Sequence, residues 1–424
     1  MGAPLKRAGA RKALDEHLRE LERLADTAGA DVVGELTQQL DRPHPGTYLG
    51  KGKIDELRQL VHDTSASLII FDDELSPSQA KNVEDTIGTR VVDRAELILD
   101  IFATRARSSE AKMQVELAQL EYTLPRLTRM WTHLEKFRGG IGVRGPGETQ
   151  LETDRRLINH RIKLLKERLA HVQQNRAVQR QARSGAFKAS LVGYTNAGKS
   201  SILRGLSGAS DIHVEDRLFA TLDPLTREVD LGENAHVLLT DTVGFIRKLP
   251  HHLVASFRAT LEETRDADLL LHVVDASHPL WEEQRMVVDQ VLVELGLAEQ
   301  PVLLVFNKID LLPEDELLAL QERVTTLVPN AVFVSAATED GLAPLRRALR
   351  HAMRARRPVS DVWLSHADGR LLAEIHQHGE VLDQRSEGDF MVIRARLPER
   401  LRGRLEQAGA DVRPAAEAQA GSAS

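Results

Sequence analysis

Apolar residues recur along the chain in patterns that separate an α/β region from the regions that follow it. Residues 5–25 carry leucines every three or four positions, which predicts an amphipathic helix. Apolar and β-branched runs then predict strands at 31–36, 67–72 and 89–93, with helical segments between them. Because strands that alternate with helices are typical of α/β folds, we expect a small α/β domain over residues 1–104.

The next region, residues 105–185, has a different periodicity. Two series of apolar residues are spaced four and three apart: Met113, Leu117, Leu120, Leu124 and Leu127, then Ile158, Ile162, Leu165, Leu169 and Val172. Such spacing forms the seam of a coiled coil, and the glycine-rich loop 138–147 separates the two series. We therefore expect an antiparallel helical hairpin, with an interruption at Pro125 inside the first helix.

The C-terminal half predicts two further domains. Strands and helices alternate again over 186–357, as expected for a doubly wound sheet. Residues 358–412 predict a small α+β domain, with strands at 379–385 and 389–396 and a helix after Pro398. Residues 413–424 offer little to bury and are expected to be disordered. The expected fold class is thus a multidomain α/β protein.

The amino-acid composition bears on the cellular compartment of the protein. The chain has 424 residues, of which 42% are hydrophobic and 28% charged, as in globular proteins with more than one core. It has no cysteine, which excludes disulfides and thiolate metal sites. No apolar stretch approaches the roughly 18 residues of a membrane span. We expect a cytoplasmic protein that is monomeric and does not insert into membranes.

The sequence GYTNAGKS at 193–200 matches the phosphate-binding loop G-x-x-x-x-G-K-[ST]. An apolar run precedes it and a helix-compatible segment follows, as this motif requires. Its glycines let backbone N–H groups surround the phosphates of a nucleotide, and the helix N-terminus adds positive potential. Lys199 is expected to reach the β- and γ-phosphates, and Ser200 to bind Mg²⁺.

Two downstream segments resemble the switches of GTP hydrolases. LFATLDPLT at 218–226 supplies Thr221, which can bind Mg²⁺ and sense the γ-phosphate. LLTDTVG at 238–244 ends an apolar strand with Asp241, which can support the Mg²⁺ ligands, and with Gly244, whose N–H can meet the γ-phosphate. The next residue is Phe245, where many GTP hydrolases have a glutamine that orients water. We therefore expect slow hydrolysis by the free protein.

Two further strand ends predict guanine recognition. VLLVFNKID at 302–310 ends with Asp310, which can accept from guanine N1–H and N2–H₂, while Asn307 braces the loops and the Lys308 stem covers the base. VFVSAA at 332–337 ends with residues whose backbone N–H groups can meet guanine O6. All of these motifs would lie at the carboxyl edge of one sheet.

The predicted site follows from these motifs. The residues expected to act in GTP hydrolysis are Lys199, Thr221 and Gly244, and those expected to hold Mg²⁺ are Ser200 and Thr221. The expected contacts to GTP or GDP are Gly193, Tyr194, Thr195, Asn196, Ala197, Gly198, Lys199, Ser200, Phe219, Ala220, Thr221, Leu222, Asp223, Asp241, Thr242, Val243, Gly244, Asn307, Lys308, Ile309, Asp310, Ser335, Ala336 and Ala337.

The hairpin region is strongly basic although the whole chain has a net charge of −7. Its basic residues over 126–183 are Arg126, Arg129, Lys136, Arg138, Arg144, Arg155, Arg156, Arg161, Lys163, Lys166, Arg168, Arg176, Arg180 and Arg183, against five acidic ones. Such a surface favours salt-sensitive binding to structured RNA, with Arg138, Arg144, Arg155 and Arg156 as the expected contacts. The alternative is a solvated face of a coiled coil.

A second glycine-rich segment, GTYLGKGK at 46–53, leaves two interpretations open. It has one residue too few for a phosphate-binding loop, and no serine or threonine follows Lys51. It is either a weak second nucleotide site or, as we favour, a turn before a helix.

The segment FRGGIGVRGPGETQLETDRR at 137–156 resembles the signature of the HflX family of translational GTPases. GKGKIDEL, FATLDPLTR and DTVGFIRKLP extend the similarity over nearly the whole chain. The resemblance implies a GTPase that binds the rRNA and proteins of the large ribosomal subunit and splits or rescues stalled or idle ribosomes under stress. A GTPase of ribosome assembly, or one acting on another structured RNA, is the alternative.

Two further expectations come with the resemblance. Related GTPases use an asparagine at the position of Asn196 to hold K⁺ against the phosphates, so K⁺ is a second candidate ion beside Mg²⁺, unless Asn196 only caps the turn. Family members usually begin with an apolar strand before the first helix. Here the helix starts almost at once, so either the start is shortened or the N-terminal sheet lacks one strand.

Overall fold

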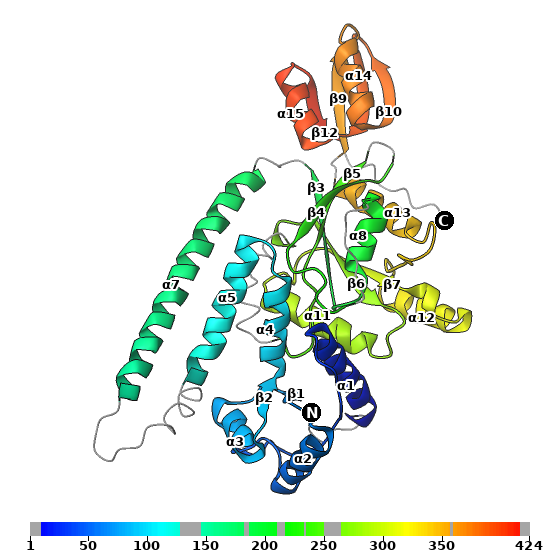
Figure 1. Ribbon diagram of the computed structural model, residues 1–424. Helices are drawn as coiled ribbons and strands as arrows, with labels where there is room; N and C mark the ends of the chain where they lie inside the picture. The colour runs from blue at the N-terminus through cyan, green and yellow to red at the C-terminus, as the bar shows by residue number, and fades with distance from the viewer. Residues whose placement is uncertain are drawn as a thin grey trace.

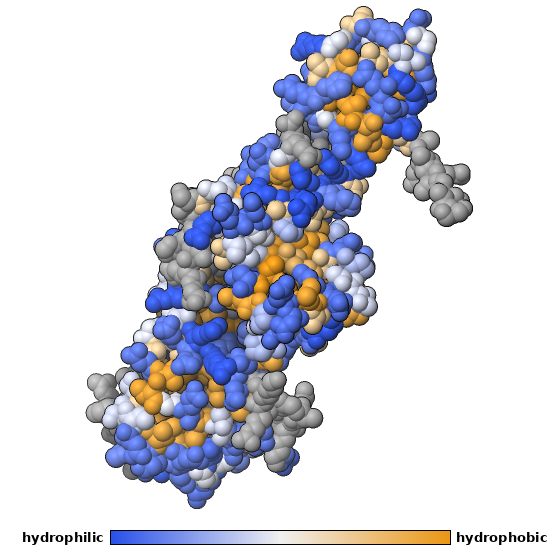
Figure 2. All heavy atoms as spheres, turned by 90° about the vertical axis from the view of Figure 1, so that its right-hand side faces the viewer, coloured by the Kyte–Doolittle hydropathy of each residue, from blue (hydrophilic) through white to orange (hydrophobic). Residues whose placement is uncertain are grey.

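The computed structural model describes residues 10–127, 146–181, 186–209, 217–232, 235–249, 264–356 and 359–415. Along the chain it forms an N-terminal α/β domain, a helical hairpin, a central α/β sheet domain and a C-terminal α+β domain (Figure 1). In Figure 1 the N-terminal and C-terminal domains lie at opposite ends of the molecule, the central sheet domain lies between them, and the hairpin runs alongside it. The surface is largely hydrophilic in the view of Figure 2. The predicted fold class is confirmed.

The N-terminal domain contains a two-stranded parallel sheet. Its elements are α1 (Ala10–Thr27), α2 (Lys51–Thr64), β1 (Leu68–Phe71), α3 (Pro77–Ile87), β2 (Arg90–Asp93) and α4 (Arg94–Arg105). In this sheet Leu68 pairs with Arg90 and Phe71 with Asp93. The segment GTYLGKGK forms a turn and the start of α2, whose N-cap is Gly50.

The strand predicted at 31–36 is wrong. These residues form no helix or strand, and Val32 and Val33 are 42% and 56% exposed. Their β-branched side chains therefore gain little by burial, and Gly34 between them and Leu36 weakens a strand further.

The hairpin consists of two antiparallel helices that lie side by side in Figure 1. They are α5 (Ser109–Thr123), which continues as the short 3₁₀ turn η1 (Leu124–Arg126), and α7 (Pro146–Gln181). Leu117, Leu165 and Leu169 are buried between the two helices, as the seam predicts. The helix ends directly before Pro125, as expected, because proline cannot continue the hydrogen-bonded ladder.

The central domain is built on a six-stranded sheet in the order β4-β5-β3-β6-β7-β8, in which only β4 is antiparallel to its neighbour. Its elements are β3 (Phe187–Gly193), α8 (Lys199–Ser207), β4 (Leu225–Asp230), β5 (His236–Asp241), β6 (Leu269–Asp275), α11 (Trp281–Glu294), β7 (Val302–Asn307), η2 (Ile309–Leu311), α12 (Glu314–Leu327), β8 (Val332–Phe333) and α13 (Ala343–Arg356). Helices α8 and α13 pack on one face, and α11 packs on the other together with α4 and α5. The predicted doubly wound sheet is thus present, and its carboxyl edge carries the nucleotide motifs.

The C-terminal domain is a four-stranded antiparallel sheet in the order β10-β11-β9-β12, with two helices packed on its core. Its elements are β9 (Val359–Ser365), α14 (Gly369–His378), β10 (Glu380–Glu387), β11 (Phe390–Arg396), α15 (Glu399–Gln407) and β12 (Asp411–Pro414). The two predicted strands and the helix after Pro398 are confirmed. Strand β12 extends to Pro414, beyond the predicted boundary at 412, because it pairs with β9, and residues 416–424 lie outside the described part of the chain.

Candidate functional site

The phosphate-binding loop joins the end of β3 to the start of α8, and its backbone is tightly packed. Gly198 has φ +93°, and a Cβ on it would lie 2.1 Å from Nδ2 of Asn307. Glycine is therefore required where the loop meets the strand that carries Asn307. Loop, switch residues and helix start together line a cavity of about 60 Å³, which includes Lys199, Thr221 and Gly244. The three residues expected to act on the γ-phosphate are thus brought together.

Lys199 is buried and lines this cavity. Its Nζ donates to the carbonyl oxygens of Gly193 at 3.1 Å and Tyr194 at 2.8 Å. Burial lowers the pKa of Lys199 to about 8, although Asp241 acts in the opposite direction. A nucleotide phosphate would supply the negative charge that this buried ammonium lacks.

The predicted Mg²⁺ ligands surround one carboxylate. Oδ2 of Asp241 accepts from Oγ of Ser200 at 2.6 Å and from Oγ1 of Thr221 at 2.9 Å, and the two hydroxyls lie 2.8 Å apart. Burial raises the pKa of Asp241, against the effect of Lys199. Oδ1 of Asp241 is buried without a hydrogen-bond partner in the described structure. Two hydroxyl ligands beside an unsatisfied carboxylate oxygen fit a hydrated Mg²⁺ ion.

Asn307 braces the loops as expected from the sequence. Its Nδ2 donates to the carbonyl of Ala197 at 2.9 Å, and its Oδ1 accepts from the N–H of Ala336 at 3.1 Å. Lys308 adopts φ +64° and forms an ion pair with Asp275 at 2.7 Å. The carboxylate of Asp310 is exposed and has no hydrogen bond or ion pair within the described residues, so it is free to accept from a base.

The segment Ser335–Ala337 differs from the expectation that its N–H groups point at guanine O6. The N–H of Ser335 donates to Gly341 at 3.2 Å, and that of Ala336 to Asn307. The N–H of Ala337 donates to Oγ of Ser335 at 3.2 Å. In this structure all three donors are satisfied by protein oxygens, one of them the side-chain amide oxygen of Asn307 at the end of β7.

Phe245 is part of the protein core and does not face the phosphate cavity. Its side chain is 1% exposed and packs with apolar residues of α4, α5 and α11. Its N–H donates to Gly193 at 3.0 Å, and its carbonyl accepts from Thr195 at 2.7 Å. The segment after Gly244 is thereby bonded to the phosphate-binding loop, and the ring lies in the apolar core and does not line the phosphate cavity.

An ionic cluster joins the N-terminal domain to the phosphate loops. Asp72 accepts from Arg94 at 2.9 Å, Arg247 at 3.0 Å and Lys248 at 2.9 Å. Burial would raise the pKa of Asp72, but the three cations lower it below its usual range. Glu20 of α1 accepts from Arg94.

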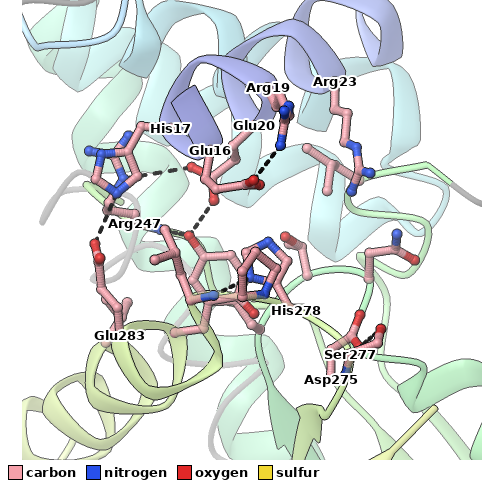
Figure 3. A pocket seen from close by; sticks show the side chains of 18 of the residues that line it. Glu16, His17, Arg19, Glu20, Arg23, Arg247, Asp275, Ser277, His278 and Glu283 are labelled. Atoms are coloured by element: carbon pink, nitrogen blue, oxygen red, sulfur yellow. Dashed lines mark hydrogen bonds and ion pairs between the residues drawn. The ribbon is translucent and has the colours of Figure 1, made fainter. Parts of the chain in front are cut away.

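Glu20 also contacts the phosphate-binding loop, because it accepts from the hydroxyl of Tyr194. Figure 3 shows α1 above a cavity of about 490 Å³, with Glu20 on one side and Arg247 and His278 on the other. Sequence reasoning did not identify this cluster, because its contacts to Tyr194, Arg247 and Lys248 join residues more than 150 positions apart in the chain.

Sequence reasoning also missed Arg217. This residue lines the phosphate cavity four positions before Thr221, is exposed, and pairs with no other described residue. Only its nearness to the FATLD segment could have indicated it.

Phe219 and Asp223, predicted nucleotide contacts, turn toward the rest of the protein. The ring of Phe219 stacks edge-on against Phe102 of α4, at 4.6 Å between centroids. Asp223 accepts from the N–H groups of Arg107 and Ser108 at the start of α5. Both residues thus connect the first switch to the N-terminal half of the chain.

Two of the four predicted RNA contacts, Arg155 and Arg156, lie in α7 with exposed side chains. The other two, Arg138 and Arg144, lie outside the described residues. Among the helices that are described, none is both long and apolar enough to cross a membrane.

Comparison with known proteins assigns the chain to one family. Family models match in three segments: GTP-binding GTPase N-terminal over 15–103, GTP-binding GTPase Middle Region over 105–183, and 50S ribosome-binding GTPase over 188–308. GTPase HflX of Flavobacterium psychrophilum is 47% identical over 359 residues, 80% of this chain and 86% of that protein. GTPase HflX of Caldanaerobacter subterraneus subsp. tengcongensis is 45% identical over 393 residues, 92% of this chain and 90% of that protein.

GTPase HflX of Escherichia coli K12 is also 45% identical, over 386 residues that make up 90% of each chain. These similarities agree with the site described above and support hydrolysis of GTP as its reaction. The chain belongs to the HflX family of GTPases.

Proposed function

We propose that this GTPase binds the large ribosomal subunit in the cytoplasm and uses GTP-controlled switching to split or rescue stalled or idle ribosomes under stress. The observation that carries the proposal is the joining of a GTPase site to a basic helical hairpin. Helix α5 of the hairpin packs in the same core as Phe219 and Phe245, the residues that flank the predicted γ-phosphate contacts. A change at the nucleotide can therefore reach the hairpin. The description of the matching domain model, 50S ribosome-binding GTPase, supports the same partner.

The exposed side of α7 supplies charge for an RNA partner. Arg155, Arg156 and Arg168 are exposed and have no ion pair within the described residues. Arg161, by contrast, binds Glu116 of α5 through two hydrogen bonds, at 2.6 and 2.9 Å, and so fastens the two helices together. Unpaired arginines are the ones that can neutralise phosphates and release counterions. Arg138 and Arg144, which stand between the two helices in the sequence, are the other two proposed contacts.

We assign the following roles in the reaction. Lys199 holds the β- and γ-phosphates, Gly244 donates its N–H to the γ-phosphate, and Ser200 and Thr221 hold Mg²⁺ beside Asp241. Mg²⁺ neutralises the charge on the phosphates when it is bound. Asp310 accepts from the guanine N–H groups. Asn196, which adopts φ +60° in the loop, is the candidate ligand for K⁺.

Hydrolysis by the free protein is expected to be slow, because the buried Phe245 cannot orient water. The ribosome would complete the site, as partner proteins do for other GTPases. This dependence would restrict GTP consumption to the bound state.

Sedimentation of ribosomes with the protein tests the proposal. With a non-hydrolysable GTP analogue we expect the protein to move with the large subunit and intact ribosomes to separate into subunits. The double variant Arg155→Glu, Arg156→Glu should bind less and split less, while its GTP turnover without ribosomes stays at the wild-type rate. Binding only to immature large subunits, with no splitting of mature ribosomes, would favour the assembly role. Failure to bind either particle would refute the ribosome as partner.

A further inference from the structure

Asp223 uses both oxygens of its carboxylate to hold the start of helix α5. Oδ2 accepts from the backbone N–H of Arg107 at 3.1 Å and from that of Ser108 at 3.2 Å. Oδ1 accepts from the hydroxyl of Ser108. The same hydroxyl oxygen accepts from the N–H of Ala111 at 3.0 Å and is the N-cap of α5. A residue of the first switch is therefore part of the cap of the first hairpin helix.

Apolar contacts anchor the other residues of this switch to the same part of the molecule. Phe219 is 2% exposed against Phe102 and adopts φ +56°, a conformation that a bulky residue keeps only where its surroundings enforce it. Leu222 is 3% exposed and belongs to the core that contains Val115 of α5. Phe219, two residues before Thr221, and Asp223, two residues after it, thus fix the chain to helices α4 and α5 outside the sheet domain.

Thr221 itself points the other way, into the phosphate cavity. Its Oγ1 lies 2.9 Å from Oδ2 of Asp241 and 2.8 Å from Oγ of Ser200. Side chains on either side of Thr221 contact α4 and α5, while its own hydroxyl reaches the predicted Mg²⁺ ligands. The position of this hydroxyl therefore depends on where α5 begins.

We propose that Asp223 is a positioning residue for GTP: by capping α5, it holds Thr221 within reach of the γ-phosphate and its ion. The proposal rests on the Mg²⁺ site assigned above and not on ribosome binding. Because a switch threonine contacts the ion and phosphate only in the triphosphate state, Asp223 should affect GTP and leave GDP unaffected. Through this cap, Asp223 also makes helix α5 of the hairpin a structural support of the nucleotide site.

Equilibrium binding of a non-hydrolysable GTP analogue and of GDP, each titrated with and without Mg²⁺, tests this role. For Asp223→Ala we expect analogue affinity in Mg²⁺ to fall about tenfold or more, as for loss of a hydrogen bond to a charged group, with GDP affinity within about twofold of wild type. Asp223→Asn keeps one acceptor oxygen, so its affinity for the analogue should lie between those of wild type and Asp223→Ala. Arg107→Ala is the matched control, because Arg107 contacts Asp223 only through a backbone N–H that the substitution retains.

Hydrogen–deuterium exchange gives a readout independent of the nucleotide. The amides of Arg107 and Ser108 should exchange faster in Asp223→Ala than in wild type or Arg107→Ala, because their acceptor is gone. Equal exchange in all three proteins would refute the hydrogen bonds from the N–H groups of Arg107 and Ser108 to Asp223.

A double-mutant cycle with Thr221→Ala separates the possible failures. If Asp223 acts through Thr221, the double variant should bind the analogue no more weakly than Thr221→Ala alone. Additive losses, or an Asp223→Ala variant that loses GDP as much as the analogue, would overturn the proposal. If Thr221→Ala alone left Mg²⁺-dependent binding unchanged, the assigned Mg²⁺ site would fail first, and the role of Asp223 with it.

Discussion

Replacing Phe245 with glutamine, the residue that many GTPases have at this position, should damage this enzyme and not accelerate it. The side chain of Phe245 is 1% exposed and lies in the core formed with α4, α5 and α11. Removing a buried phenylalanine ring costs about 3–5 kcal/mol, and a glutamine amide buried without a partner costs about 1–3 kcal/mol more. Because whole proteins are stable by only about 5–15 kcal/mol, this loss is large.

Thermal unfolding measures the loss of stability in Phe245→Gln, and GTP turnover measures the effect on hydrolysis. A loss of about 4–8 kcal/mol should lower the melting temperature by roughly 4–9 °C in a chain of this size. Turnover by free Phe245→Gln should not exceed that of wild type, because the N–H and carbonyl of residue 245 hold it against Gly193 and Thr195 with the side chain turned inward. The new amide therefore cannot reach water at the γ-phosphate.

Phe245→Leu is the matched control for this experiment. It keeps an apolar side chain, so it should lose only about 1 kcal/mol and hydrolyse GTP at the wild-type rate. The reasoning would be refuted if Phe245→Gln were as stable as Phe245→Leu and hydrolysed GTP at least about tenfold faster than wild type.

Four further predictions concern residues of the nucleotide site and of α7. Asn307→Ala leaves the carbonyl of Ala197 and the N–H of Ala336 unpaired, so GTP and GDP affinity, measured by fluorescent-nucleotide titration, should both fall about 30-fold or more; unchanged affinity would contradict the bracing role. Lys199→Met should abolish GTP binding yet raise the melting temperature of the nucleotide-free protein below about pH 8, because burial lowers the pKa of Lys199 to about 8. This difference in melting temperature should shrink as pH rises above 8, where Lys199 in the folded wild type loses its charge. A difference that grew with pH would refute the explanation by the buried charge. Asp310→Asn should weaken GTP and admit xanthosine triphosphate in competition binding, whereas unchanged GTP affinity would exclude the base contact. Arg155→Glu combined with Arg156→Glu should reduce the slope of ribosome affinity against salt concentration, and an unchanged slope would show that these arginines contact no phosphate.

The sequence predicted most of what is local in this protein. The glycines and Lys199 of the phosphate-binding loop, the strand ends at Asp241 and Asn307 and the leucine seam of the hairpin all depend on spacing along one segment. Backbone geometry then fixes where such side chains point. These elements appear in the structure at the predicted positions.

Contacts between distant segments could not be predicted. Asp72 and Arg247 are 175 residues apart, and Asp223 and Ser108 are 115 apart. Nothing in either segment indicates its partner, because a carboxylate near a turn is equally consistent with a nucleotide contact, a helix cap or solvent. The failed strand at 31–36 has a related cause, since β propensity alone does not supply a neighbouring strand.

The two switch segments have one physical property in common that their motifs do not reveal. Phe219 and Leu222 of the first switch and Phe245 of the second are all buried in a single apolar core, which also contains residues of α4 and α5. Protein cores are close-packed, so one of these side chains cannot move far unless its neighbours repack. A partner that shifts the hairpin would therefore act on both switches at once, and a γ-phosphate that draws in Thr221 and Gly244 would act on the hairpin. Coupling of this kind is reciprocal in binding free energy: if GTP strengthens binding at the hairpin, the hairpin's partner must strengthen binding of GTP by the same factor. Binding to the ribosome should thus raise the protein's affinity for the GTP analogue, relative to its affinity for GDP, by a certain factor. Exchanging GDP for the analogue should raise the protein's affinity for the ribosome by the same factor.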